Sequence, residues 1–240
     1  MNPFSDEYCR KEISDFNCPS FTSGKITIKK VKIEGRCDDF LNVNYRAGIT
    51  AIEDCPVFLK NNSIWMSLTP MEIQSQYLPI LHGKNNEKVA TVGLGIGYFT
   101  VMIMGASKVK IIDVYEIDQE VIDTFKINFS EREGFSKVNF ILGDFRKTFK
   151  NKEYDFCYLD PYQDMLPDEI LKDYEMLHKE NKIKFLRPWG IEKCFEDIQE
   201  APQDIGEFIS MNTSKLKETY SDPEYNERIL YMLNDKEHFF

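Results

Sequence analysis

The stretch "VGLGIGYFT", residues 92–100, holds three glycines at alternate positions, Gly93, Gly95 and Gly97. The apolar run "KVATV" precedes it and the apolar run "YFTVMIM" overlaps its end, which predicts a strand, a tight turn and a helix. Glycines in such a turn let backbone N–H groups approach a ligand closely. Ligands of open α/β sheets bind beyond the carboxyl ends of the strands, so this turn is predicted to border a binding site.

The residues that follow the turn alternate between strand and helix patterns. We expect strands at 88–93, 108–117, 137–144, 154–162 and 181–188, separated by helices at 98–105, 118–131, 145–149 and 167–178, with a further helix at 191–199 and a late strand at 226–233. Strands that alternate with crossover helices form a parallel sheet covered on both faces. The predicted fold class is therefore α/β, with a doubly wound, mostly parallel sheet.

The first quarter of the chain has a β-rich pattern instead. Residues 1–22 look irregular, residues 25–35 alternate apolar and polar side chains as a half-buried strand does, and residues 41–47 predict a weaker strand. Two short apolar runs flank Asn61-Asn62, which predicts a hairpin because asparagine tolerates positive φ.

A helix is predicted to begin after this hairpin. Thr69 can cap it, Pro70 suits its first position, and Glu72 completes a capping box. Gly83 is a plausible end, and Pro79 is expected to kink the helix or end it early. We therefore divide the chain into a small β-rich N-terminal subdomain or lid, 1–68, and a larger ligand-binding domain, 69–240.

The composition narrows the classes of partner. The formal net charge is −10 and the pI is near 5.0, so a nucleic-acid backbone would be repelled, and a neutral or cationic small molecule is the expected substrate. No apolar run approaches the roughly 20 residues of a membrane-spanning helix. The N-terminal residues lack the basic-then-apolar order of a signal peptide, so we expect a cytoplasmic protein without a membrane partner; a homodimer stays open.

Cysteine and histidine usage argues against a structural metal. The chain has three histidines and six cysteines, none in a C-x-x-C pair. Reduced, mostly buried thiols are the expected state of the cysteines. The strand end at 187–188, Arg-Pro, offers no carboxylate or amide ligand either, so no metal is predicted.

The glycine spacing separates two classes of ligand. A dinucleotide fingerprint reads G-x-G-x-x-G, but Tyr98 stands where its third glycine would be, so a dehydrogenase is the least favoured interpretation. The observed G-x-G-x-G resembles motif I of the class I methyltransferases that use S-adenosylmethionine (SAM). Acidic residues follow the next strands in the order typical of that superfamily: Glu116, Asp144 and Asp160.

This resemblance covers residues 88–186 and implies a Rossmann-like SAM-binding domain. It implies that the three glycines pass beneath the methionine and ribose moieties, that Glu116 accepts hydrogen bonds from the ribose hydroxyls, and that Asp144 meets the adenine amino group. It also places Asp160 near the reacting centre, so Asp160 counts both as cofactor-binding and, with Tyr162, as a candidate catalytic residue. The implied activity is methyl transfer from SAM to a small-molecule or exposed amine.

Three other functions stay open. The tetrapeptide "DPYQ", residues 160–163, is similar to the D-P-P-Y motif of methyltransferases that act on nucleic-acid base amines, but lacks its second proline. The β-rich front segment, "YEID" and "YDFCYLD" resemble spermidine synthases, which use decarboxylated SAM as an aminopropyl donor. The acidic residue of their glycine loop is replaced here by Ile96. A catalytically inactive SAM- or nucleoside-binding module is the third alternative.

Large aromatic residues outside these motifs are interpreted as core. Trp65, Tyr77 and Trp189 could each line a substrate pocket. We favour packing in the core for all three, because large aromatic side chains usually stabilise a protein by burial.

Overall fold

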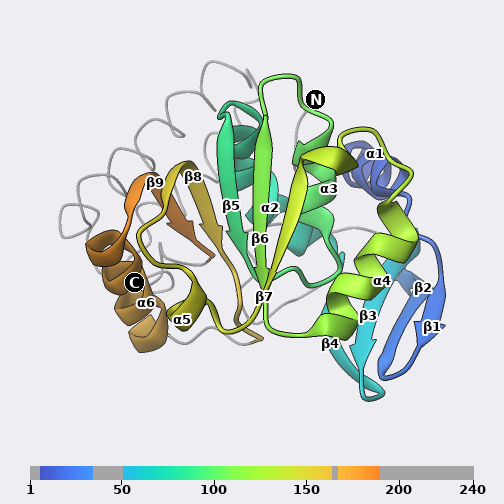
Figure 1. The fold of residues 1–240 in the computed structure, drawn as a ribbon. Helices are drawn as coiled ribbons and strands as arrows, with labels where there is room; N and C mark the ends of the chain where they lie inside the picture. The colour runs from blue at the N-terminus through green and yellow to red at the C-terminus, as the bar shows by residue number, and fades with distance from the viewer. Residues whose placement is uncertain (1–5, 35–50, 164–166, 190–240) are drawn as a thin grey trace, which may run out of the picture.

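The computed structural model describes residues 6–34, 51–163 and 167–189, and two separate β-sheets organise them (Figure 1). The first sheet is antiparallel, with its strands in chain order: β1 (Phe21–Ser23), β2 (Ile26–Glu34), β3 (Ala51–Lys60) and β4 (Ser63–Ser67). The predicted hairpin joins β3 to β4, and both Asn61 and Asn62 have positive φ, 53° and 63°. The expected strand at 25–35 is β2, so these two predictions are confirmed.

The second sheet is parallel throughout and has five strands in the order β7-β6-β5-β8-β9. Its strands are β5 (Lys88–Val92), β6 (Ile111–Glu116), β7 (Val138–Leu142), β8 (Glu153–Leu159) and β9 (Lys182–Pro188). All five fall on segments predicted as strands. The chain begins with the central strand β5, adds β6 and β7 on one side of it, and then crosses over to add β8 and β9 on the other side. This topology confirms the doubly wound α/β class and its Rossmann-like character.

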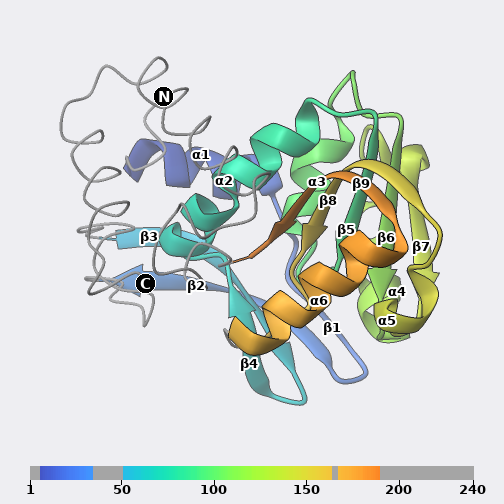
Figure 2. The ribbon, with the colours of Figure 1, turned by 90° about the vertical axis from the view of Figure 1, so that its left-hand side faces the viewer.

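The helices are α1 (Asp6–Phe16), α2 (Pro70–Lys84), α3 (Tyr98–Met104), α4 (Gln119–Phe129), α5 (Phe145–Thr148) and α6 (Pro167–Glu180), with a 3-10 turn η1 (Phe135–Lys137). Figure 2 shows α2 between α1 and the parallel sheet. Thr69 caps α2 as predicted, with its hydroxyl accepting the N–H of Glu72, and Pro70 is the first residue. The helix continues past Pro79 to Lys84, so the expectation of an early end is wrong.

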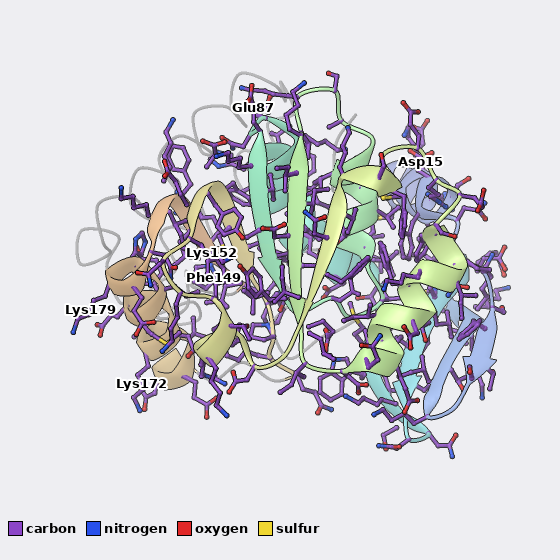
Figure 3. All side chains as sticks on the ribbon, in the orientation of Figure 1. Asp15, Glu87, Phe149, Lys152, Lys172 and Lys179 are labelled. Atoms are coloured by element: carbon purple, nitrogen blue, oxygen red, sulfur yellow. The ribbon has the colours of Figure 1, made fainter. Side chains whose placement is uncertain are left out.

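The parallel sheet is covered on both faces because successive strand residues point to opposite sides. Val89 belongs to the core shared with α1 to α4, while the next residue, Ala90, belongs to the core shared with α5 and α6. On the outer side of α6, Lys172 and Lys179 are exposed and point away from the sheet (Figure 3). The amphipathic pattern of the crossover helices thus decides which face each one buries.

The first sheet shares a core with one face of the second. Ile26 and Ile28 of β2, and Ile52 of β3, are buried in the same cluster as Val89. The division into a subdomain, 1–68, and a domain, 69–240, stays a prediction. Two such units would share one apolar core.

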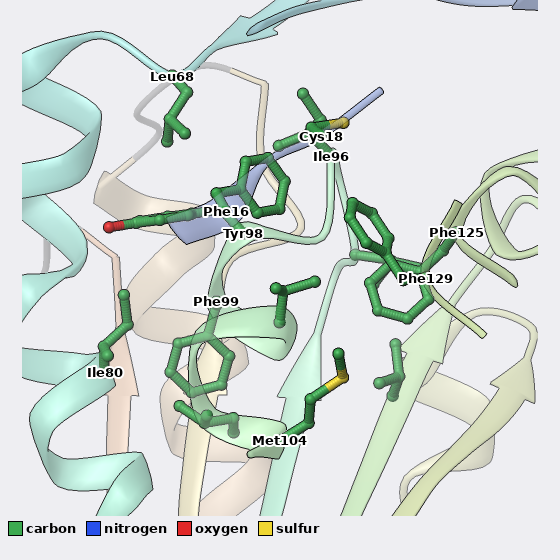
Figure 4. Close-up of a cluster of buried hydrophobic side chains, with 14 of the residues drawn as sticks. Phe16, Cys18, Leu68, Ile80, Ile96, Tyr98, Phe99, Met104, Phe125 and Phe129 are labelled. Atoms are coloured by element: carbon green, nitrogen blue, oxygen red, sulfur yellow. The ribbon is translucent and has the colours of Figure 1, made fainter. Parts of the chain in front are cut away.

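The N-terminal residues are not irregular, contrary to the prediction. Residues 6–16 form α1, which buries Cys9, Ile13 and Phe16 on one side. Figure 4 shows Phe16 beside Tyr98, where the two rings meet edge to face with centroids 5.5 Å apart. The helix is therefore stabilised by tertiary packing against α3. Its mostly charged sequence does not indicate this packing.

Three sequence predictions, the strand at 41–47, the helix at 191–199 and the strand at 226–233, lie outside the described residues. Among the residues that are described, no helix combines the length and the apolar character that crossing a membrane requires.

Candidate functional site

A cavity of about 400 Å³ opens at the carboxyl end of the parallel sheet. Its floor is the glycine turn after β5 and the residues that end β6, β7 and β8, and its other walls come from β4 and α2. Ligands of open α/β sheets bind at this edge, beside the strand where the order reverses. Of the seven site residues predicted from the sequence, the structure places six in this wall: Gly93, Gly95, Glu116, Asp144, Asp160 and Tyr162.

The glycine turn is needed by the fold itself. Gly93 has φ +85°, and a Cβ atom there would lie 2.2 Å from the carbonyl oxygen of Asp160. Gly95 has φ +52°, and a Cβ atom there would lie 2.6 Å from the sulfur of Met66. At Gly93 both the positive φ and the backbone neighbour exclude a larger residue, whereas at Gly95 the positive φ disfavours one and the Met66 side chain would have to move. The turn therefore stays narrow enough to leave the cavity open above it.

Gly97 is set apart from the other two glycines. It caps α3 and faces the ring of Phe125 on α4, outside the cavity wall. Gly97 therefore does not line the cavity, and its role in holding a cofactor stays a prediction. The residue serves the packing of α4 against the turn.

Glu116 ends β6 and is only 9% exposed. Its two carboxylate oxygens each accept a backbone hydrogen bond, from Leu94 N–H at 2.9 Å and from Asp118 N–H at 2.9 Å. Burial raises the pKa of Glu116, and the two N–H donors and the charge of Lys60 act in the opposite direction. The backbone thus orients a carboxylate that has unused acceptor capacity on each oxygen.

Asp144 follows β7 and caps α5, where its carboxylate accepts the N–H of Arg146 at 3.0 Å. The guanidinium of Arg146 also lines the cavity and forms a two-pronged hydrogen bond with Asp173 of α6, at 2.8 and 2.7 Å. Asp144 therefore lies at the rim of the cavity because it is the N-cap of α5. An aspartate after a glycine at the end of a strand is a capping signal that the sequence alone shows.

Asp160 follows β8 and is half-buried in the cavity wall. Tyr158 donates a hydrogen bond to it at 3.2 Å. Burial, and then the negative charge of Glu72, raise the pKa of Asp160, whereas the hydrogen bond from Tyr158 lowers it. Two carboxylates near one another in a half-closed space favour a proton or a cationic ligand between them.

Tyr162 lines the same cavity, but its hydroxyl is already engaged. It donates to Asp173 at 2.7 Å. Burial and this bond to a carboxylate both raise the pKa of Tyr162. The ring can therefore form part of the substrate wall, while its phenol is poorly placed to exchange a proton with a substrate.

Sequence reasoning missed the wall contributed by α2 and by the hairpin. Glu72 and Gln76 of α2 line the cavity, and Gln76 Nε2 donates to Glu72 Oε1. Gln76 is 3% exposed, and its Oε1 has no hydrogen-bond partner among the described residues. A buried acceptor without a partner at a cavity wall is satisfied when a ligand donates to it. The spacing of four residues on one capped helix was the available signal.

The tryptophans are both core and wall. Trp65 of β4 and Trp189 after β9 line the cavity while also packing against the apolar core, and Trp189 Nε1 donates to Ser75 at 3.0 Å. Tyr77 meets Tyr8 of α1 edge to face instead and lies outside the wall. The prediction of core packing therefore describes only part of the role of the two tryptophans, because both also line the cavity.

No three cysteine, histidine or acidic side chains come together in a metal-ligating group within residues 6–34, 51–163 and 167–189. The sequence prediction that the protein binds no metal stays a prediction. In the same part of the chain, the cysteines at 9, 18, 55 and 157 are buried and free of disulfides, in line with the expected reduced thiols.

Comparison with protein families finds one match. The model of the spermine/spermidine synthase domain matches residues 76–234, which is more than half of the chain. No curated protein matches the sequence.

Solved structures that resemble the chain include spermidine synthase from Thermotoga maritima, with 15% identity over 68% of this chain and 53% of that one, and a TM-score of 0.42. An O-methyltransferase from Bacillus cereus in complex with SAH has 13% identity over 62% and 70%, with a TM-score of 0.40. Precorrin-8w decarboxylase from Methanobacterium thermoautotrophicum has 20% identity over 48% and 59%, with a TM-score of 0.38. The match thus spans little more than half the length of the first and the last of these proteins.

Proposed function

The chain belongs to the spermine/spermidine synthase domain family, and from this premise we propose that it is a SAM-dependent methyltransferase acting on a small-molecule amine. One observation carries the proposal. The same cavity is lined by Glu116, whose carboxylate is oriented by backbone N–H groups so that it can bind ribose hydroxyls, and by Glu72 and Asp160, an acidic pair that can bind an ammonium group.

The donor half of the proposal rests on Glu116. Its two oxygens are oriented by backbone N–H groups and can each accept a further hydrogen bond. The 2′ and 3′ hydroxyls of a ribose present two adjacent donors, which match this arrangement. Ile117, next in the chain, is 69% exposed at the cavity wall and offers an apolar surface to a nucleobase.

The acceptor half rests on three acceptors from α2 and β8. One cavity is lined by the carboxylates of Glu72 and Asp160 and by Gln76, whose Oε1 has no partner within the part of the chain that the structure describes. An ammonium group has three N–H donors and no acceptor, so this set recognises a protonated amine and would leave an alcohol incompletely bound. The substrate class that follows is a small cationic amine.

The chemistry asks little of the protein beyond alignment and one proton transfer. The amine nitrogen forms a bond to the methyl carbon as the carbon–sulfur bond of the donor breaks, and the sulfonium becomes a neutral thioether. Before attack, the ammonium has to lose a proton to expose its lone pair. Asp160 is proposed to take it, because a carboxylate whose pKa is raised is a stronger base than an exposed one.

The second candidate is aminopropyl transfer from decarboxylated SAM, which the family match favours. The glycine loop argues for the carboxylated donor. At the loop position where spermidine synthases carry an acid, Ile96 is 2% exposed and its N–H donates to the sulfur of Met66 at 3.3 Å. An acidic side chain there would repel the carboxylate of SAM, and isoleucine does not.

Methylation of nucleic-acid bases is less well supported by the charges. In the described part of the cavity wall the basic side chains are Lys60 and Arg146, and each is paired with an aspartate, at 2.8 and 2.7 Å. Neither is available to neutralise a phosphate backbone. A small amine therefore remains the proposed partner, with a cytoplasmic location as an accompanying expectation.

Calorimetry with S-adenosylhomocysteine (SAH) tests the donor site. The variant Glu116→Gln should weaken binding about tenfold or more, because its NH2 group would face one of the two backbone N–H donors that hold the carboxylate, and the charged acceptor is lost. The matched variant Glu131→Gln, beyond α4 and exposed, should bind as the wild type does. Absence of SAH binding by the wild-type protein at millimolar ligand would contradict the proposal.

The transferred group is identified by offering SAM and decarboxylated SAM together with a panel of diamines. The mass added to the acceptor distinguishes a methyl from an aminopropyl group. Exclusive use of decarboxylated SAM would replace the leading proposal by the second, and binding of SAH without turnover on any amine would favour an inactive binding module.

A further inference from the structure

An ionic cluster joins the antiparallel sheet to the start of α4. Asp118 caps α4, and one oxygen of its carboxylate forms ion pairs with Lys60 Nζ at 2.8 Å and with Lys25 Nζ at 2.9 Å. Lys25 also contacts Glu120, with its side chain at 3.5 Å and its backbone N–H at 3.0 Å. The cluster therefore fastens β2 and β3 to the segment that directly follows Glu116.

The two lysines differ in what else they face. Lys60 lines the cavity and lies over the ring of Trp65, with Nζ 4.9 Å from the ring centroid. Lys25 lies outside the cavity wall. The side chain of Lys60 is 20% exposed and that of Lys25 is 32% exposed. A charge held in a less exposed place is less screened by water, so Lys60 acts more strongly on the cavity.

Glu116 is the cavity group that faces this charge. It is joined to the cluster through Asp118, whose N–H donates to Glu116 Oε1 at 2.9 Å. Among the described residues, the charged groups that act on Glu116 are Lys60, from β3, and Asp118, from the start of α4; Lys25 and Glu120 lie behind Asp118. Burial and the negative charge of Asp118 favour the neutral form of Glu116, whereas the positive charge of Lys60 favours the ionised form.

We propose that Lys60 is a positioning residue of the donor site, which keeps Glu116 ionised and places the β3–β4 hairpin over it. The inference rests on the proposed role of Glu116 in ribose binding and adds that the antiparallel sheet supplies the counter-charge. Ribose hydroxyls donate more strongly to a carboxylate than to a neutral carboxyl group. The donor site is therefore completed only when the first sheet is docked on the second.

A dependence on pH follows from this arrangement. Donor binding requires ionised Glu116, so it is strong above the pKa of that group and falls as the pH drops through it. Replacing Lys60 by a neutral residue removes a charge that lowers this pKa. The acid limb of the binding curve then moves to higher pH, and one pKa unit corresponds to about a tenfold change in the ratio of the two forms.

The test compares Lys60→Met with Lys25→Met, which removes the other lysine of the same aspartate. SAH binding is measured by calorimetry from about pH 5 to pH 8. None of the described residues of the cavity wall is a histidine, so a change in affinity over this range reports on the acidic side chains. Lys60→Met should lose about tenfold in affinity at the acid end and less at the alkaline end, with Lys60→Arg restoring the wild-type curve. Lys25→Met should keep the wild-type pH dependence even if it lowers the melting temperature.

A titration without ligand keeps the inference separate from the proposed function. The carboxyl carbon of Glu116 is followed by NMR, assigned with Glu116→Gln. A midpoint shifted to higher pH in Lys60→Met and unshifted in Lys25→Met supports the inference, even if SAH fails to bind and the proposed function falls. Equal midpoints in all proteins, or equal shifts in both lysine variants, would overturn it.

Discussion

At the scale of single residues, Asp160 combines two roles that oppose each other. The site needs an acidic group with a raised pKa, and the fold has to hold that group beside Glu72. A carboxyl whose folded-state pKa is raised contributes stability that is fully present below its unfolded pKa and is lost as the pH rises through the folded one. Asp160 therefore lowers the stability of the protein at neutral pH.

The variant Asp160→Asn should separate the two roles. We expect turnover to fall by a factor of about 10² to 10⁴, because the proton acceptor is lost, and the free energy of unfolding at pH 8 to rise by about 1 kcal/mol, as is common when an acidic functional group is made neutral. Urea unfolding at about pH 3 and pH 8 measures the second effect, which should vanish at about pH 3 because the carboxyl is then neutral in both the folded and the unfolded chain. Asp123→Asn, on the exposed side of α4, is the control, and a variant less stable than wild type at pH 8 would contradict this account.

The glycine turn allows a second comparison at this scale. Gly95→Ala places a Cβ atom at positive φ and 2.6 Å from Met66, and should cost about 1–3 kcal/mol. Gly105, at the end of α3, has φ −76°, and no atom of the described residues lies within 4 Å of an added Cβ. Gly105→Ala should therefore be neutral or stabilising by about 0.5 kcal/mol. Thermal unfolding of both variants checks the difference; equal melting temperatures would mean that the turn adapts without strain.

At the scale of elements, α1 is held by a buried hydrogen bond to the helix that follows the glycine turn. Tyr98 of α3 donates to Glu12 of α1 at 2.6 Å, and the two residues are 2% and 6% exposed. Burial, then the charge of Glu12, raise the pKa of Tyr98. The tyrosine that excludes a dinucleotide fingerprint thus has a structural purpose, since it anchors a helix more than 80 residues away in the sequence.

Tyr98→Phe should therefore destabilise the protein by about 1–3 kcal/mol, because it leaves the carboxylate of Glu12 buried without its donor. Removing both polar groups, in Tyr98→Phe with Glu12→Leu, should recover part of this loss, with a coupling energy of about 0.5–3 kcal/mol in the double-mutant cycle. The measurement is urea unfolding at pH 7. Additive losses would show that the bond contributes nothing to the docking of α1.

The elements themselves were mostly readable from the sequence, with α1 as the main exception. Apolar runs that end in glycine or an acidic residue predicted β5 to β8, and a helix follows each of these strands in the chain. In α1, by contrast, the buried Cys9, Ile13 and Phe16 stand among charged residues. Their helical spacing gains its meaning only from the partner surface on α3.

At the scale of the whole molecule, the two sheets meet at the cavity. The parallel sheet supplies Glu116, Asp144 and Asp160 from three strand ends, while the hairpin and α2 supply Lys60 and Glu72. The antiparallel sheet is thus part of the site as well as of the core. Ligand binding and docking of the two sheets are expected to stabilise one another for this reason.

The sequence by itself determined the α/β class, the glycine turn and the acidic strand ends. These depend on local spacing, and parallel strands carry their carboxyl ends to one edge of the sheet whatever their lateral order. Only the tertiary structure decided the order β7-β6-β5-β8-β9, the approach of Met66 to the turn, and the meeting of Lys60 with Asp118. The physical reason is that such contacts join residues dozens of positions apart, and packing of the whole chain selects them.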